Sequence, residues 1–123
     1  MRFMMLMIPK GYEKAAPGTV PDAKAVEAMM KYNESLQKAG VLLALDGLHP
    51  PSMGARITFP GGKAKVTDGP FSEAKEVVGG YSIIEAKSHA DAVEIATRFM
   101  ELHRIHWPGF EGESEVRPFE DMP

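Results

Sequence analysis

The chain has 123 residues, enough for one domain with a single hydrophobic core and too few for two. Its 14 basic and 17 acidic residues give a formal net charge of −3, and no run of Lys or Arg offers the concentrated basic face that nucleic acids require. Cysteine is absent from the sequence, which excludes disulfides, thiol nucleophiles and zinc sites built on thiolates.

The first third of the chain predicts two strands with a helix between them. Residues 3–8 and 41–45 are unbroken apolar runs, typical of strands that are covered on both faces. A helix is predicted over residues 22–39, with Gly40 placed to end it. The first apolar run stops at Pro9, too short for a signal peptide or a membrane span, so we expect a cytoplasmic protein with no membrane partner.

The rest of the chain predicts a hairpin followed by a second strand–helix–strand unit. In chain order, the predicted elements are a hairpin over 55–67, a strand over 79–86, a helix from Ser88 to near His103, and a strand over 115–119. Pro60-Gly61-Gly62 supplies the tip of the hairpin. Ser88 and Asp91 have the spacing of a capping box, and Pro118 indicates that the last strand lies at a sheet edge.

This order of elements is that of a ferredoxin-like α+β sandwich, in which two strand–helix–strand units interleave. Two helices can cover only one face of a sheet, whereas the strands at 3–8, 41–45 and 81–86 are apolar on both sides. A large exposed apolar sheet is not stable in a soluble monomer. The sequence therefore predicts a homodimer whose sheets face each other through an obligate, hydrophobic interface.

One long stretch resembles a known family. The run "VTDGPFSEAKEVVGGYSIIEA", followed by a helix and "EVRPF", is similar to the DGPF-type branch of the YCII-related proteins, and "AGVLLALDGLHPP" fits the same pattern upstream. The resemblance spans nearly the whole chain. It implies a bacterial protein with one YCII-related, DGPF-like domain over residues 1–123 and the fold of a dimeric α+β barrel.

Some YCII-like relatives are small-molecule enzymes in which a His on the first helix and an Asp just beyond the second are proposed as the working pair. This chain reads Met29-Met30 where the His is expected, and Met100-Glu101-Leu102-His103, with no Asp, past the second helix. The proposed pair is therefore not carried over, and whether the protein is an enzyme stays open.

The stretch "TDGPFSEAKE" has two interpretations. As a structural joint, Asp68 accepts hydrogen bonds from nearby backbone N–H groups, Gly69 supplies permissive backbone dihedrals, and Phe71 anchors the corner. As a site, a carboxylate of Asp68 or Glu76 beside the ammonium of Lys75 would bind a polar molecule in a cleft, where one of them could act as a general base. Both interpretations stay open.

Histidines and one arginine complete the candidate chemistry. His49 follows a central strand and is the best candidate for proton transfer, paired with Asp68 as an acid/base couple. Arg117 would bind a carboxylate, either of a ligand or of an internal Asp or Glu. His103 and His106 have helical spacing for a metal, but nothing fixes a third ligand, so we expect no metal and no cofactor.

Two classes of function follow. The first is a small cytoplasmic homodimer that binds or converts a small polar molecule in a cleft lined by the DGPF turn, with His49 and Asp68 as catalytic candidates and with Phe71, Lys75, Glu76 and Arg117 as ligand-binding candidates. The second is a non-catalytic accessory or regulatory module, because members of the family resemble partners found beside, or fused to, alternative sigma factors.

Overall fold

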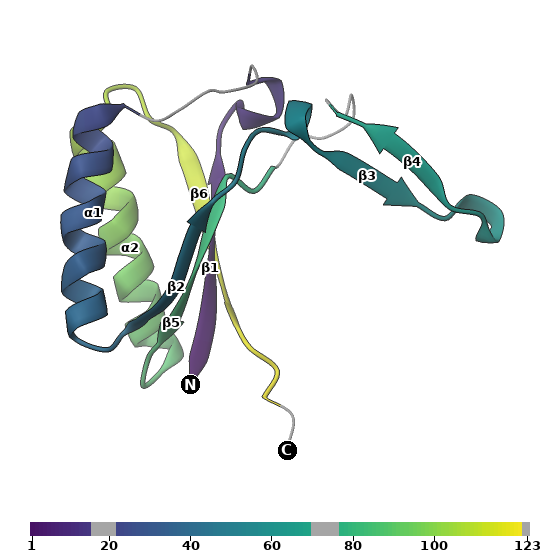
Figure 1. Cartoon of the computed structure of the whole chain (residues 1–123). Coiled ribbons are helices and arrows are strands. Elements are labelled where there is room, and N and C mark those ends of the chain that lie inside the picture. The colour runs from purple at the N-terminus through teal and green to yellow at the C-terminus, as the bar shows by residue number, and fades with distance from the viewer. Residues whose placement is uncertain (16–21, 70–76, 122–123) are drawn as a thin grey trace.

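The computed structural model describes residues 1–15, 22–69 and 77–121, and Figure 1 shows their arrangement. The strands are β1 (Arg2–Pro9), β2 (Leu42–Gly47), β3 (Ala55–Thr58), β4 (Lys65–Asp68), β5 (Gly80–Glu85) and β6 (Gly112–Pro118). The α-helices are α1 (Ala23–Lys38) and α2 (His89–His106), and the short 3-10 helices are η1 (Tyr12–Lys14), η2 (Pro51–Met53) and η3 (Pro60–Gly62).

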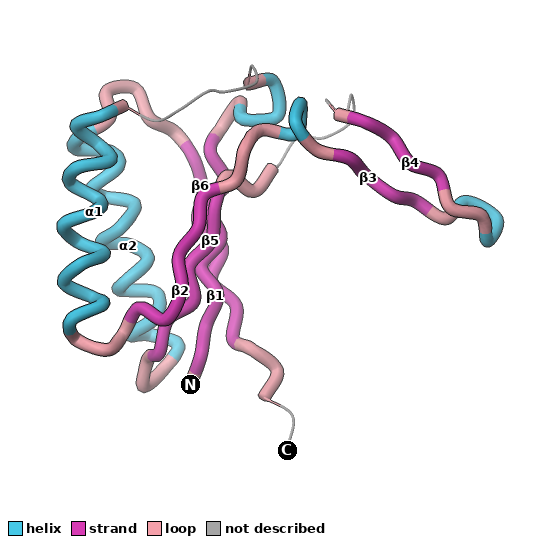
Figure 2. The backbone as a smooth tube through the Cα atoms, viewed as in Figure 1, coloured by secondary structure: helices cyan, strands magenta, loops and turns pink. Residues whose placement is uncertain are grey.

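The main sheet has the strand order β2-β5-β1-β6, and every neighbouring pair in it is antiparallel. This order, with α1 joining β1 to β2 and α2 joining β5 to β6, confirms the predicted ferredoxin-like α+β fold. Pro118 ends β6 at the sheet edge, as its missing N–H requires. Figure 2 shows both α-helices on the same side of the sheet.

Local sequence signals explain where α1 begins and ends. The Asp22 carboxylate accepts hydrogen bonds from the backbone N–H groups of Lys24 and Ala25, so it is the N-cap. Gly40 follows the helix with a φ of 73°, the left-handed conformation expected of a glycine that ends a helix. These boundaries confirm the predicted helix.

The second helix begins as predicted and ends later. The Ser88 hydroxyl accepts a hydrogen bond from the Asp91 N–H, which confirms Ser88 as the N-cap. The helix continues to His106, beyond the predicted end near His103, and the Trp107 N–H still donates to the His103 carbonyl. The additional turn is exposed and ends directly before Trp107, which lines the site described below.

The hydrophobic core lies between the helices and the sheet. Phe3 and Ile84 are fully buried on the two central strands. Ala92 and Ala96 of α2 pack against them, and their small side chains let the helix approach the sheet closely. No helix among the described residues is both long and apolar enough to cross a membrane.

The opposite face of the sheet is open in the single chain. Side chains alternate between the faces of a strand, so Met4, Leu6 and Ile8 of β1 lie on the face away from Phe3 and Met5. The register pairs Met4 with Ile83 and Leu6 with Tyr81, which places these residues on the same face. This open face is therefore apolar along both central strands.

The strands β3 and β4 form an arm, residues 54–69, that projects from the body on the side of the open face (Figure 1). Its base is closed by the Gly69 N–H, which donates to the Gly54 carbonyl at 2.9 Å. Gly69 has no positive φ, so the expectation that it supplies special dihedrals is wrong. A Cβ atom there would instead overlap the Pro51 carbonyl, and this close backbone approach is what requires glycine.

Candidate ligand-binding cavity

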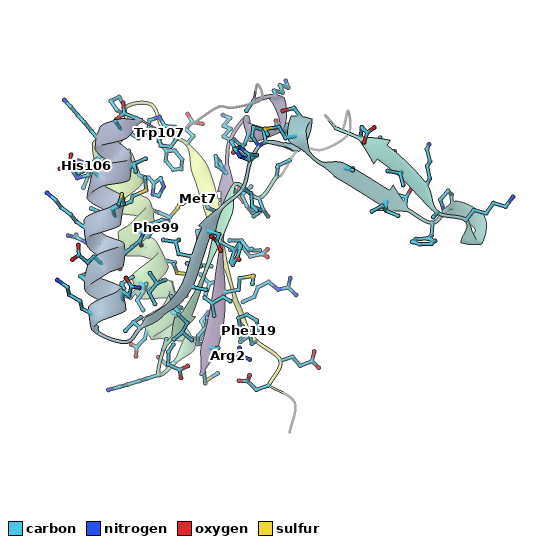
Figure 3. The ribbon with its side chains drawn as sticks, viewed as in Figure 1. Arg2, Met7, Phe99, His106, Trp107 and Phe119 are labelled. Carbon is cyan, nitrogen blue, oxygen red and sulfur yellow. The ribbon has the colours of Figure 1, made fainter. Side chains whose placement is uncertain are left out.

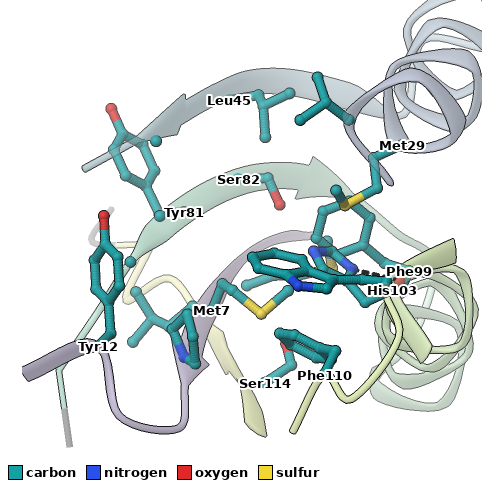
Figure 4. Close-up of a pocket in the computed structure, with 18 of the residues that line it drawn as sticks. Met7, Tyr12, Met29, Leu45, Tyr81, Ser82, Phe99, His103, Phe110 and Ser114 are labelled. Atoms are coloured by element: carbon teal, nitrogen blue, oxygen red, sulfur yellow. Dashed lines mark hydrogen bonds between the residues drawn. The ribbon is translucent and has the colours of Figure 1, made fainter. Parts of the chain in front are cut away.

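A cavity of about 570 Å³ lies between the two helices and the sheet, toward the end of the sheet from which the arm projects. Its floor comes from β1, β5 and β6, and its roof comes from α1 and from the last turns of α2 (Figure 4). Four methionines line it: Met5 and Met29, which are buried, Met7, which is half-buried, and Met30, which is 64% exposed. The volume falls within the range typical of small-molecule sites.

Aromatic rings form one wall of the cavity. Phe99 and His103, one turn apart on α2, meet edge to face with ring centroids 4.6 Å apart. After the helix, Gly109 adopts a φ of 78° and the Phe110 N–H donates to the Trp107 carbonyl, which folds the loop back toward His103. The Phe110 ring then lies 4.9 Å from His103 and 5.3 Å from Trp107. Figure 3 shows Phe99 and Met7 between helices and sheet.

His103 is the one buried titratable side chain in the described part of this wall, with 5% of its surface exposed. Its Nδ1 lies 2.9 Å from the Phe99 carbonyl oxygen, which can only accept, so Nδ1 carries the proton. Burial lowers the pKa of His103 from its ordinary value of 6.5, against the smaller opposing effect of this hydrogen bond. A neutral ring with Nδ1 protonated has a lone pair on Nε2, available as an acceptor.

Other polar side chains, Ser82, Asn33 and Ser114 among them, line the cavity without a side-chain hydrogen bond to any described residue. Ser82 on β5 is 4% exposed, its hydroxyl turned into the cavity, and Asn33 lies on the inner face of α1. Within the described residues, neither of them makes a side-chain hydrogen bond, and Nε2 of His103 has no partner either. Each of these atoms keeps some accessible surface, because the buried side-chain atom without a partner among the described residues is Oε2 of Glu13. They can therefore bond to a molecule that enters the cavity.

The mouth of the cavity is held by contacts between distant segments. The Tyr12 hydroxyl donates to the Leu48 carbonyl at 2.5 Å, and the Leu48 N–H donates to the Gly79 carbonyl. Lys10 and Glu111 pair at 2.7 Å, and this contact raises the pKa of Lys10 and lowers that of Glu111. Both side chains are well exposed, so the pair contributes little to stability.

The residues proposed from sequence lie outside this cavity. His49, Asp68 and Arg117 are exposed; His49 precedes η2, Asp68 ends β4, and Arg117 pairs with Met4 across the sheet. The contact of Gly69 with Pro51 brings the segments of His49 and Asp68 together at the base of the arm, but no hydrogen bond joins these two described side chains. The other three candidates, Phe71, Lys75 and Glu76, lie outside the described residues.

The cavity residues that sequence reasoning missed carry a visible signal. Positions 92, 96, 99, 103 and 107 recur at helical spacing, so the apolar face of α2 continues past the predicted helix end through His103 to Trp107. His103 is thus a wall residue, whereas His106 is exposed. Among the described residues, no group of three or more His, Asp or Glu is arranged to hold a metal ion.

Comparison with known protein families identifies the family of this chain. No curated protein matches the chain. Residues 1–101 match the YCII-related domain, a region that runs from β1 into the fourth turn of α2 and includes most of the cavity lining. The match covers well over half of the sequence, and the chain therefore belongs to the YCII-related family.

Proposed function

We propose that this protein binds a small organic molecule in the cavity between the helices and the sheet. The observation that carries the proposal is a set of polar groups that line the cavity without a partner among the described residues: His103 Nε2, the Ser82 hydroxyl and the Asn33 amide. A guest with an apolar, flat body would contact Phe99 and the methionines, and a hydrogen-bond donor on it would reach Nε2.

The acid/base couple of His49 and Asp68 is the catalytic part of the proposal. Both residues lie on segments that meet at the base of the arm. Asp46 and Gly47, shortly before His49 in the sequence, belong to the cavity lining, so this base is continuous with the cavity mouth. Conversion of a bound molecule would then take place at the mouth. Arg117 shares the open face with Met4 and so lies away from this mouth, and Phe71, Lys75 and Glu76 remain ligand-binding candidates outside the described residues.

Two finer assignments belong to the same proposal: membership of the DGPF-type branch and a homodimer formed through the open face of the sheet. The second is supported by the apolar side chains of β1 and β5 on that face, which are only half-buried in the single chain. The accessory or regulatory module stays the alternative, and an occupied cavity in the purified protein would argue against it.

Methionine methyl NMR tests the binding proposal directly. Protein labelled with carbon-13 at the methionine methyl groups is titrated with indole, which has an aromatic body and an N–H donor, and with 1-benzothiophene, which has the same shape without the donor. Indole should shift the signals of the methionines in the cavity: Met5, Met7, Met29 and Met30. Met4 on the open face and Met53 in η2 should not respond.

The matched variants are His103→Asn, which removes Nε2, and Ser35→Ala, which removes a hydroxyl from the exposed side of α1. Asn places an amide nitrogen near the position of Nδ1, so the bond to the Phe99 carbonyl can persist. Indole should bind His103→Asn at least about 5-fold more weakly, and Ser35→Ala unchanged. Equal affinities of indole and benzothiophene, or shifts spread evenly over all methionines, would refute the proposal.

A further inference from the structure

We propose that the arm docks on a second copy of this chain, with its apolar side chains against the partner and its lysines beside the acidic end of the partner's β6. This inference rests on the proposed sheet-face dimer and adds to it a specific role for residues 54–69. The occupant is a second copy because the arm, the open face and the charges of one chain complement each other under two-fold symmetry.

The arm is an amphipathic ribbon whose apolar side is uncovered. Ile57 and Val66 are paired across the two strands, so both side chains are on one face of the ribbon, and they are 59% and 64% exposed. Thr58, paired with Lys65, lies on the opposite face. A two-stranded hairpin is only marginally stable alone in water, and alternation of this kind is typical of a ribbon with one buried face.

The arm adds a second surface to the open face of the sheet. Strands lie about 4.8 Å apart and rise about 3.3 Å per residue, so the open face of the four-stranded sheet covers roughly 400 Å² in plane. Stable interfaces bury about 800 Å² per partner. The arm projects on the same side as this face and would enlarge the surface that a partner buries (Figure 1).

The register of the sheet shows where the arm would meet the partner. Gly47 pairs with Gly80, Gly80 with Met7, and Met7 with Ser114, so these residues form one row from edge to edge of the sheet. The arm leaves the sheet after Gly47, at the β2 end of this row. A two-fold axis parallel to the strands places the β2 edge of one copy over the β6 edge of the other, at the same level.

Charge complementarity favours that axis. Glu113 and Glu115 flank Ser114, and they pair with Ile8 and Leu6, which places both carboxylates on the open face at the β6 edge. The arm carries Lys63 just after its tip and Lys65 at the start of β4, both exposed. The arm of one copy would therefore bring Lys63 to the partner's glutamates at a rim position, where opposite charges fix register. Lys65 lies on the polar face with Thr58, so its long side chain would reach them around the edge of the ribbon.

Zero-length cross-linking tests this contact. A carbodiimide joins a lysine to a carboxylate only where the two groups touch. Unlabelled and nitrogen-15-labelled chains are mixed, exchanged and cross-linked, and the peptides are analysed by mass spectrometry. We expect peptides that join Lys63 or Lys65 of one isotope to Glu113 or Glu115 of the other. Cross-links of these lysines within single-isotope peptides only would overturn the arm contact.

Variants of the two arm faces provide the energetic test. Ile57→Thr with Val66→Thr removes the apolar face and keeps β-branched residues, whereas Thr58→Val with Thr67→Val makes the opposite change on the polar face. In sedimentation experiments, the first pair should weaken the dimer at least about 10-fold, and the second should change its Kd less than about 3-fold. Circular dichroism verifies that each variant folds.

The outcomes separate the two levels of the proposal. A wild-type chain that is monomeric at micromolar concentration overturns both the sheet-face dimer and the arm contact, and leaves the apolar face to a different protein. A stable dimer whose Kd is the same in both variant pairs overturns the arm contact alone. A weakened dimer together with mixed-isotope cross-links supports the arm contact as stated.

Discussion

Replacing His103 by Asn should make the stability of the protein less dependent on pH. His103 is buried, and burial lowers its pKa in the folded state below the value of 6.5 that it has when solvated. Above this value the ring is neutral in both states, so the pH dependence from His103 is zero. As the pH falls below 6.5, the unfolded chain takes up a proton that the folded chain refuses, and the free energy of unfolding decreases.

The size of the effect follows from proton linkage. One proton taken up only by the unfolded state changes the free energy of unfolding by up to about 1.4 kcal/mol per pH unit. The decrease ends once the pH passes the lowered pKa of the folded state. Between pH 6.5 and 5.5 the wild type should therefore lose up to about 1 kcal/mol more than His103→Asn, because the unfolded ring is already half protonated at pH 6.5, and above pH 7.5 the two curves should run parallel.

Urea denaturation at half-unit steps from pH 5 to 8 measures this difference. His106→Gln is the matched control, because it removes an exposed imidazole three residues further along α2 and leaves His103 in place. The control should keep the low-pH loss of the wild type. If the wild type and His103→Asn differ by a constant amount at every pH, the imidazole is not held neutral, and the proposed acceptor at Nε2 loses its basis.

Three further predictions concern the core, the arm base and the candidate couple. Phe3→Ala should cost about 3–5 kcal/mol, or roughly 15 °C in Tm for 123 residues, because the ring is fully buried; a calorimetric shift below 5 °C would contradict this. Gly69→Ala should lower Tm and expose the amide of Gly54 to hydrogen exchange, since the methyl group overlaps the Pro51 carbonyl; unchanged exchange would argue against that packing. Asp68→Asn should leave Tm within about 2 °C because the side chain is exposed, so a lost ligand response in this variant would indicate a role in the site, and unfolding would indicate a joint.

The fold could be predicted from sequence because its signals are local and periodic. The apolar run of β1 predicts a strand, and Asp22 and Gly40 mark the two ends of α1. The order of the elements then allows only a few sheet topologies. The open face could also be predicted from the number of helices, because two helices can cover only one side of the sheet.

The site could not be predicted in the same way because it is built from separate segments. The cavity joins Asn33 of α1, Ser82 of β5 and His103 of α2, and no short motif contains more than one of them. The charged residues in the stretch around Asp68 indicated a site there, whereas a single serine in an apolar strand gives no sequence signal. The role of Gly69 was missed for a related reason, since the atom that excludes a side chain there belongs to a residue 18 positions earlier in the chain.

The four methionines around the cavity give it a wall that can change its shape. Thioether chains are unbranched and turn easily about three bonds, so they can follow the outline of differently shaped guests instead of demanding one. Selectivity would then come from where a guest places its donor, and shape would contribute less. The same sulfur atoms make the lining sensitive to oxidants, because each sulfoxide would put a polar oxygen where the guest needs an apolar surface.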